Sequence, residues 1–121
     1  MFSVKKFVGS FKYAWQGLVH LFRHEQNAYV HLLALTVVVL AGFYFDIRNY
    51  EWVSIFICVG LVFCCELINT AIERIVNFVS PKYHKNAGVI KDLGAAAVLI
   101  AALISLIVAA IIFTPYLKNL T

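Results

Sequence analysis

The chain has 121 residues, of which 63% are apolar, and ten Lys and Arg against six Asp and Glu give a formal net charge of +4. Soluble domains are usually about half apolar, so this composition excludes an ordinary soluble protein and indicates one integral membrane domain covering residues 1–121. The positive charges are grouped at the ends of apolar segments, which argues against a nucleic-acid partner.

The N-terminal segment 1–24 is predicted to form an amphipathic helix on the membrane surface. Its apolar residues recur every three or four positions from Val4 to Phe22, and lysines occupy much of the remaining face. A basic helix with many aromatic side chains suits the headgroup layer of a membrane. Packing of this helix on a partner protein is the alternative interpretation.

Three apolar segments follow, 28–45, 52–79 and 93–116. Each can cross a hydrocarbon core of about 30 Å at about 1.5 Å per residue. We therefore expect an all-α membrane protein with a surface helix and three transmembrane helices. Lys and Arg are concentrated before the first span and between the second and third, which predicts a cytoplasmic N-terminus and an external C-terminus. Because three spans make a thin bundle, we also expect a homo-oligomer.

The first span begins with polar residues. Asn27 and His31 are four positions apart and would share one face of a helix. A lone histidine in such a place is usually a satisfied structural group. The nearby Glu25 and Asn27 keep His31 as a candidate site residue.

The second span carries a polar stripe. Its members are spaced by three and four positions and would lie along one side of a helix; they are Glu66, Asn69, Thr70, Glu73 and Asn77. An ionisable group inside a membrane span is costly, so it is by default a functional hypothesis. The three cysteines of this span have no spacing typical of a disulfide or zinc site and are interpreted as apolar filling.

Depth along the second span separates the two acids. Counting about 1.5 Å per residue from Trp52, Glu66 lies about 21 Å and Glu73 about 31 Å into the membrane from the outer side. Glu73 would therefore lie near the cytoplasmic surface, level with Glu25 at the start of the first span. Two carboxylates at this level would suit Mg²⁺, which binds one or two carboxylates together with substrate phosphates.

A basic loop precedes the third span. Ser80 and Pro81 end the second span, residues 82–88 form the loop, and Lys91 and Asp92 begin the third span. Lys91 would either extend its amine to the membrane surface or contact a phosphate near the metal.

The arrangement favours phosphoryl transfer to a lipid hydroxyl. The sequence has no P-loop, no HExxH motif and no Ser-His triad pattern. A submerged Glu66 below a cytoplasmic acidic pair, with lysines nearby, offers a base and charge neutralisation for a phosphoryl group.

Three stretches resemble the small bacterial integral-membrane lipid kinases, a family that comprises diacylglycerol kinases and undecaprenol kinases. They are E-L-I-N-T-A-I-E from Glu66 to Glu73, K-D-L-G-A-A-A-V from Lys91 to Val98, and Y-A-W-Q-G-L from Tyr13 to Leu18. The resemblance implies a homotrimeric bundle in the bacterial inner membrane, with active sites shared between subunits.

The same resemblance implies residue roles. Glu66 would be the catalytic base supported by Asn69, and Glu25 and Glu73 would hold Mg²⁺. The residues implied to bind ATP are Lys6, Tyr13, Lys82, Tyr83, His84, Lys91 and Asp92. Two positions depart from the family pattern, because many members have Asp at Asn77 and Arg at Lys6.

The residues implied to contact the lipid are Ala14, Trp15, Asn27 and His31. Ala14 replaces a serine of the diacylglycerol kinases, and Glu25, Asn27 and His31 match the E-x-N-x-x-x-H of the undecaprenol branch. These matches favour undecaprenol, converted to undecaprenyl phosphate, and diacylglycerol, converted to phosphatidic acid, is the alternative.

Two other classes of function remain open from the residues alone. A proton-coupled small transporter would also carry a membrane glutamate, although it needs access from both sides and the acids here lie toward the cytoplasm. A structural subunit could use the polar stripe only to join helices.

Overall fold

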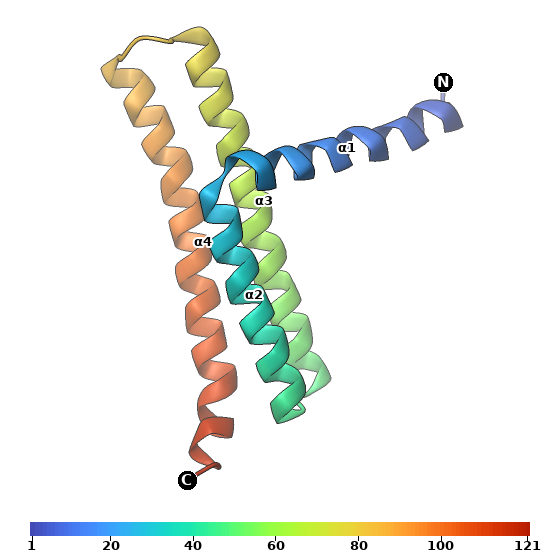
Figure 1. Cartoon of the computed structure of the whole chain (residues 1–121), viewed down its shortest axis with the longest axis vertical. Helices are drawn as coiled ribbons and strands as arrows, with labels where there is room; N and C mark the ends of the chain where they lie inside the picture. The colour runs from blue at the N-terminus through green and yellow to red at the C-terminus, as the bar shows by residue number, and fades with distance from the viewer.

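The computed structural model describes residues 1–121 and is entirely helical. Its four helices are α1 (Val4–His24), α2 (Gln26–Phe45), α3 (Asn49–Val79) and α4 (Lys85–Lys118). Helices α2, α3 and α4 form an elongated bundle, and α1 leaves the bundle at a steep angle (Figure 1). The prediction of an all-α protein is confirmed, and α2, α3 and α4 are each long and apolar enough to cross a membrane.

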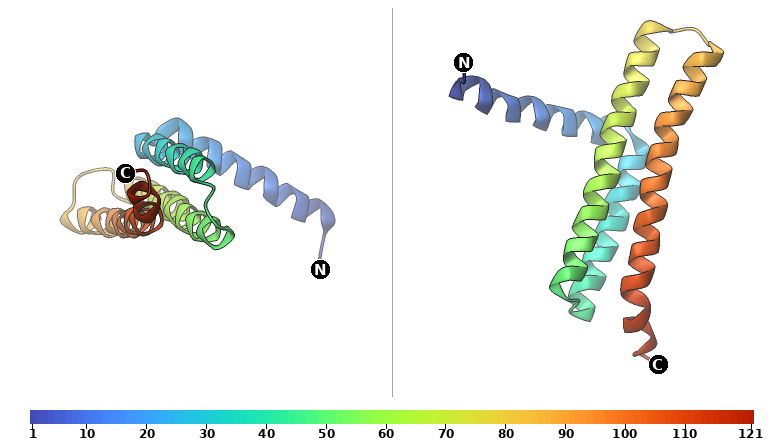
Figure 2. Two further views of the ribbon diagram at one scale, coloured as in Figure 1. Left: turned by 90° about the horizontal axis from the view of Figure 1, so that it is seen from below. Right: turned by 180° about the vertical axis from the view of Figure 1, so that it is seen from behind.

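A single residue joins α1 to α2. Ser3 caps the start of α1 by accepting a hydrogen bond from the Lys6 backbone N–H. At the other end Glu25 adopts an extended backbone, with φ −112° and ψ 112°, and its N–H donates to the Leu21 carbonyl. The chain therefore changes direction at one residue, so that α1 forms an arm beside the bundle (Figure 2).

The turn between α2 and α3 is short and closely packed. Asp46 has a left-handed backbone with φ 51°, a conformation that Asp tolerates better than most residues. Its N–H donates to the carbonyls of Gly42 and Phe43. The Trp52 ring lies so close to Gly42 that an added Cβ there would overlap it. These contacts make α2 and α3 antiparallel neighbours.

The buried core lies at the same end of the bundle as this turn. Ile47, Ile55 and Ile112 form its centre, with partly buried side chains from α2, α3 and α4 around them. The Glu51 carboxylate is only 8% exposed and accepts hydrogen bonds from the Arg48 N–H and the Tyr116 hydroxyl. This end of the molecule therefore joins all three long helices.

The opposite end is a hairpin of α3 and α4 that extends past the junction of α1 and α2 (Figure 1). Helix α4 begins at Lys85, eight residues before the predicted start of the span at 93. The reason is a cap: His84 Nδ1 accepts a hydrogen bond from the Asn86 N–H at 3.1 Å. Lys91 and Asp92 consequently lie inside the helix and not at its first turn.

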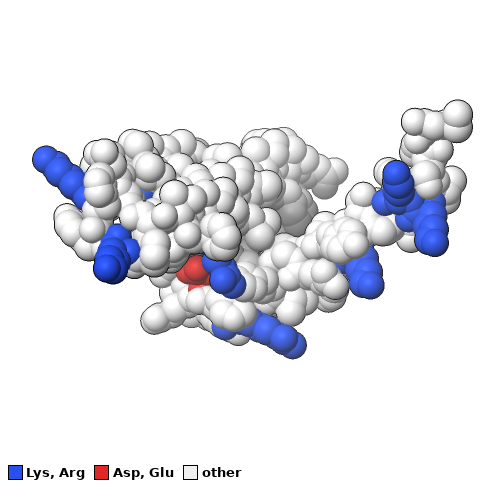
Figure 3. Space-filling view, turned by 90° about the horizontal axis from the view of Figure 1, so that it is seen from above, with Lys and Arg blue, Asp and Glu red and all other residues white.

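Most apolar side chains of the long helices are exposed in the single chain. Only 14 of 121 residues are buried, too few for a chain of this size to be covered by its own packing. These helices therefore require lipid or other protein around them. Lys and Arg side chains are spread over the hairpin end and the α1 arm, with a small acidic area between them (Figure 3).

Candidate functional site

The polar stripe of α3 faces the inside of the bundle over most of its length. Glu66 is 2% and Thr70 8% exposed, Asn69 and Glu73 are half-buried, and Asn77 is exposed. Glu66 and Glu73 are two helical turns apart and therefore lie on the same side of α3. The side chains of the stripe most enclosed by the protein are thus Glu66, at its start, and Thr70.

Glu66 has one side-chain partner, which comes from α2. His31 Nε2 lies 2.8 Å from Glu66 Oε1, and the His31 side chain is 18% exposed. Phe63 packs edge-on against the His31 ring, with the ring centroids 6.3 Å apart. The His31 imidazole is therefore held by two residues of α3, the Glu66 carboxylate and the Phe63 ring.

Asn69 connects the stripe to α4. Its Nδ2 donates to Glu73 Oε1 at 3.3 Å, while its buried Oδ1 has no hydrogen-bond partner. An added Cβ on Gly94 would overlap Asn69 Oδ1, so α3 and α4 approach closely here because residue 94 has no side chain. Thr70 Oγ1 is also buried without a partner. Two unsatisfied oxygens so close to Glu73 mark a polar site whose hydrogen bonds are incomplete in the single chain.

The junction of α1 and α2 lies against the part of α3 that carries Glu73. The Arg74 guanidinium donates to the His20 ring on α1. Partial desolvation, then the nearby Arg74 charge and then His24 lower the pKa of His20 below its ordinary value, and the Glu25 carboxylate opposes this shift. Arg74 follows Glu73 in sequence, so the end of α1 that leads into Glu25 lies next to the α3 segment that carries Glu73.

The carboxylates of Glu25 and Glu73 could hold a hard divalent cation. No hydrogen bond or ion pair occupies the Glu25 side chain, and Glu73 uses one oxygen for Asn69. No three His, Cys, Asp or Glu residues of the chain cluster as a metal site. Mg²⁺ needs only one or two carboxylates when phosphates and water complete its shell, so the two acids fit this metal better than a metal that needs an all-protein cage.

The residues expected to bind ATP do not converge in one chain. Lys6 and Tyr13 are on the exposed arm, and Tyr13 is 71% exposed. The others follow the hairpin: Lys82 and Tyr83 are exposed in the turn, His84 caps α4, Lys91 is half-buried and Asp92 is exposed. The arm points away from the hairpin (Figures 1 and 2). The two groups therefore remain separate within the chain.

The residues expected to contact the lipid are similarly divided. Ala14 and Trp15 are exposed on the α1 arm, and Asn27 is exposed at the start of α2. Only His31 lies inside the bundle, so it is the one member of this group in contact with the polar stripe.

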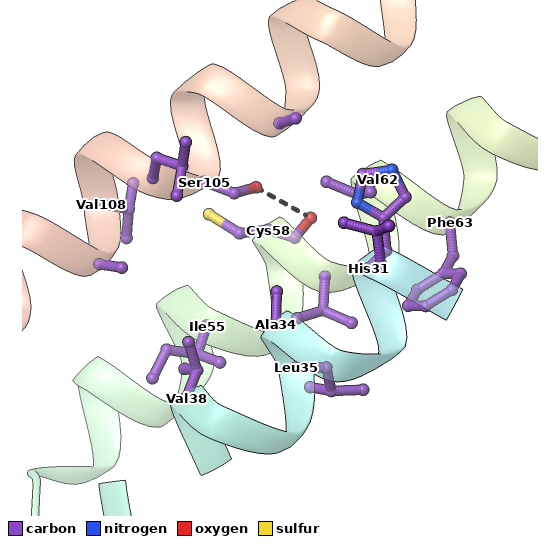
Figure 4. A pocket seen from close by; sticks show the side chains of 15 residues that line it. His31, Ala34, Leu35, Val38, Ile55, Cys58, Val62, Phe63, Ser105 and Val108 are labelled. Atoms are coloured by element: carbon purple, nitrogen blue, oxygen red, sulfur yellow. Dashed lines mark hydrogen bonds between the residues drawn. The ribbon is translucent and has the colours of Figure 1, made fainter. Parts of the chain in front are cut away.

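An apolar cavity lies beside His31. It has a volume of about 270 Å³, is bounded by α2, α3 and α4, and 13 of its 15 lining residues are hydrophobic. His31 and Ser105 are its polar members, and Ser105 Oγ lies 3.5 Å from the Cys58 carbonyl across the cavity wall (Figure 4). The same hydroxyl donates to the Ala101 carbonyl at 2.8 Å. This space could accommodate part of an apolar molecule next to the histidine that contacts Glu66.

Three site contacts were not predicted from the sequence. They are the His31–Glu66 pair, the position of Gly94 against Asn69, and the Arg74–His20 contact. Helical spacing suggested Asn27 as the neighbour of His31, whereas the observed partner is 35 residues away. The only sequence signal for the second contact was the run of small residues after Lys91, which indicates close helix packing but not the partner.

The sequence matches the model of the family described as "Prokaryotic diacylglycerol kinase" over residues 12–113. The chain is 38% identical to "Undecaprenol kinase" of Bacillus subtilis (strain 168), over 95% of this chain and 94% of that protein. It is 33% identical to "Diacylglycerol kinase" of Synechocystis over 92% of this chain and 64% of that one. "Diacylglycerol kinase" of Escherichia coli (strain K12) is also 33% identical, over 78% of each chain.

Proposed function

This multi-pass membrane protein belongs to the prokaryotic diacylglycerol kinase family and is a lipid kinase, and we propose that its lipid substrate is undecaprenol. The reaction would transfer the γ-phosphoryl group of ATP to the lipid hydroxyl and form undecaprenyl phosphate. Diacylglycerol, converted to phosphatidic acid, is the second candidate, favoured by the names of the other relatives.

One observation carries the choice of lipid. The relative named for undecaprenol aligns with nearly the full length of both chains at 38% identity. The Escherichia coli relative named for diacylglycerol aligns over a shorter part at 33%. The Glu25, Asn27 and His31 pattern and the presence of Ala14 point to the same choice.

Glu66 is the proposed general base. Its carboxylate is buried and contacts His31, which lines an apolar cavity that could hold part of the lipid. A base within reach of the attacking hydroxyl is the main chemical help that phosphoryl transfer needs besides positioning and charge neutralisation. Asn69 would support the site by holding Glu73, to which it donates a hydrogen bond.

Glu25 and Glu73 would hold Mg²⁺, which when bound would neutralise negative charge on the ATP phosphates. The proposed nucleotide contacts are Lys6, Tyr13, Lys82, Tyr83, His84, Lys91 and Asp92. Because the arm and the hairpin carry separate groups of these residues, we propose a homotrimer in which the arm of one subunit completes the site of another.

The proposed orientation follows the charges. Eight of the ten Lys and Arg lie on the arm or the hairpin, so both would face the cytoplasm, with α1 in the headgroup layer of the bacterial inner membrane and the C-terminus outside. This orientation also brings ATP from the cytoplasm to Glu25 and Glu73.

A direct comparison of lipids tests the proposal. Purified protein in detergent micelles is given ATP and Mg²⁺ with equal mole fractions of undecaprenol or diacylglycerol, and phosphorylated lipid is measured. We expect kcat/KM to be at least about tenfold higher for undecaprenol, which corresponds to about 1.4 kcal/mol of transition-state binding. Faster phosphorylation of diacylglycerol would reject undecaprenol, and no transfer to either lipid would reject the assigned activity.

A Glu66→Gln variant serves as the inactive control in the same assay. It keeps the shape of the side chain but removes the base, so we expect kcat to fall at least about 100-fold while the oligomer stays intact by size-exclusion chromatography. Near-normal turnover by Glu66→Gln would show that Glu66 is not the general base.

A further inference from the structure

The contact between His31 and Glu66 joins the first span to the proposed base. Glu66 is 2% exposed, and the His31 imidazole is the only side chain bonded to it. A carboxylate buried in an apolar region is costly unless a partner satisfies it. The imidazole therefore determines how this carboxylate is held.

The geometry restricts what His31 can do. Its Nε2 is directed at Glu66 Oε1 at 2.8 Å, and the ring is supported by Phe63. No hydrogen bond involves Nδ1. The same side chain forms part of the wall of the apolar cavity (Figure 4), so the residue that holds the carboxylate also borders the space where a lipid chain could lie.

We infer that His31 is a positioning residue for Glu66, fixing one carboxylate oxygen so that the other faces the lipid hydroxyl. The inference rests on the proposed function, because it assigns Glu66 as the base. It differs from direct lipid recognition by His31, because the imidazole acts through Glu66. Nucleophilic sites commonly pair a base with a third group that orients it.

The proton balance is simple. As the lipid oxygen forms its bond to the γ-phosphorus, its O–H bond breaks and the proton moves to Glu66 Oε2. The bond between the γ-phosphorus and the ADP oxygen breaks, and ADP leaves. His31 keeps its proton on Nε2 throughout and its hydrogen bond to Oε1, so it neither gains nor loses charge.

Kinetics of two substitutions test this role. His31→Phe keeps a ring but removes the donor, so the carboxylate loses its orientation. We expect kcat to fall about 100-fold, the cost typical of a misplaced catalytic group, with the lipid KM within about twofold of the wild-type value. His31→Gln offers an N–H₂ donor at similar reach, so its kcat should be at least about tenfold higher than that of His31→Phe.

The matched control is Thr36→Val. Thr36 is an exposed residue of α2, five positions from His31, and its hydroxyl donates only to the Leu32 carbonyl. We expect this variant to retain wild-type kcat and KM. An increase in lipid KM with unchanged kcat in His31→Phe would overturn the inference in favour of direct lipid binding. A His31→Gln variant no more active than His31→Phe would also overturn it.

A second measurement does not depend on activity. The ring nitrogens of histidine are labelled with ¹⁵N and their NMR resonances are compared in the wild type and in Glu66→Gln. We expect the His31 resonances to shift and those of the distant His84 to stay unchanged. Identical His31 resonances in the two proteins would show that the contact is absent and would overturn the inference.

The outcomes separate this inference from the proposed function. If the wild type prefers diacylglycerol, the choice of undecaprenol fails, but the same kcat comparison is made with diacylglycerol and still decides the role of His31. If neither lipid is phosphorylated, the kinase assignment fails, and with it the role of His31 in transfer. The labelled histidine then reports only whether the pair exists.

Discussion

At the scale of residues, Gly94 links helix packing to the site. It allows the Asn69 amide to lie against α4, and Asn69 in turn donates to Glu73. Position 94 therefore requires glycine because the Asn69 amide fills the space that a side chain would need. The backbone does not require it, because Gly94 has an ordinary helical conformation.

Gly94→Ala is expected to disturb both stability and activity. The new methyl group would overlap Asn69 Oδ1 and displace it, at a cost of about 1–3 kcal/mol typical of overpacking. Displaced Asn69 would release Glu73, so the Mg²⁺ concentration needed for half-maximal activity should increase. Thermal unfolding in detergent and a magnesium titration of lipid phosphorylation measure the two effects.

Gly60→Ala is the control for this change. Gly60 also lies inside a long helix, and no atom approaches the position of its added Cβ within 4 Å. We expect this variant to be as stable as the wild type or slightly more so, because Ala favours a helix more than Gly does. Equal effects of the two substitutions would contradict the packing argument.

Sequence reasoning identified the polar stripe but not its contacts. The spacing of Glu66, Asn69 and Glu73 depends only on helix geometry, so it could be derived from one segment. The partner of Glu66 depends on how α2 and α3 are aligned, which no local pattern specifies. Helical spacing therefore predicts Asn27 as the neighbour of His31, whereas its observed contact is with Glu66 across the bundle.

At the scale of helices, the contact between Tyr116 and Glu51 closes the end of the bundle opposite the hairpin. The Tyr116 hydroxyl near the end of α4 donates to a buried carboxylate in the first turn of α3. The same carboxylate accepts the Arg48 N–H at 2.9 Å. The pair thus joins α4 to the turn between α2 and α3.

Tyr116→Phe should weaken this end without affecting transfer. The substitution removes one donor to a buried carboxylate and should lower the free energy of unfolding by about 1 kcal/mol. Its kcat should be unchanged, because the contact is far along α3 from Glu66. Thermal unfolding in detergent measures the loss, and Tyr44→Phe is the control because Tyr44 is 74% exposed and makes no hydrogen bond. Equal stability of the two variants would contradict the prediction.

The number and order of the helices were predictable, and the start of α4 was less so. Apolar length alone predicted the three long helices, since a membrane span must satisfy its backbone internally. The start of α4 at Lys85 depends on the His84 ring accepting a backbone N–H. A polar stretch from Lys82 to Gly88 resembles a loop by composition, so the added helical turns could not be derived from hydropathy.

At the scale of the whole molecule, a single chain leaves its long helices largely uncovered. Six of the 14 buried residues are spread along α3, and the α1 arm contributes only Leu21. The arm and the hairpin also separate the proposed nucleotide residues. Both features are consistent with the proposed assembly of several chains with shared sites.

Mixed oligomers test whether sites are shared. Tyr13→Ala on the arm and Lys91→Ala on the hairpin should each lower activity strongly when expressed alone. If a site takes Tyr13 from one subunit and Lys91 from the next, random co-assembly leaves about one quarter of the sites intact. Phosphorylation by the co-expressed mixture, compared with each variant alone, measures the recovery. The absence of recovery would indicate that each site uses one chain.

The junction at Glu25 has a mechanical consequence. It is the only residue between α1 and α2, so the backbone torsions around it set the angle of a 21-residue lever. A ligand bound to the Glu25 side chain would also restrict the backbone torsions at this junction. Ligand binding at the carboxylate and the angle between α1 and α2 would therefore be coupled through one residue, and a change in either would affect the other.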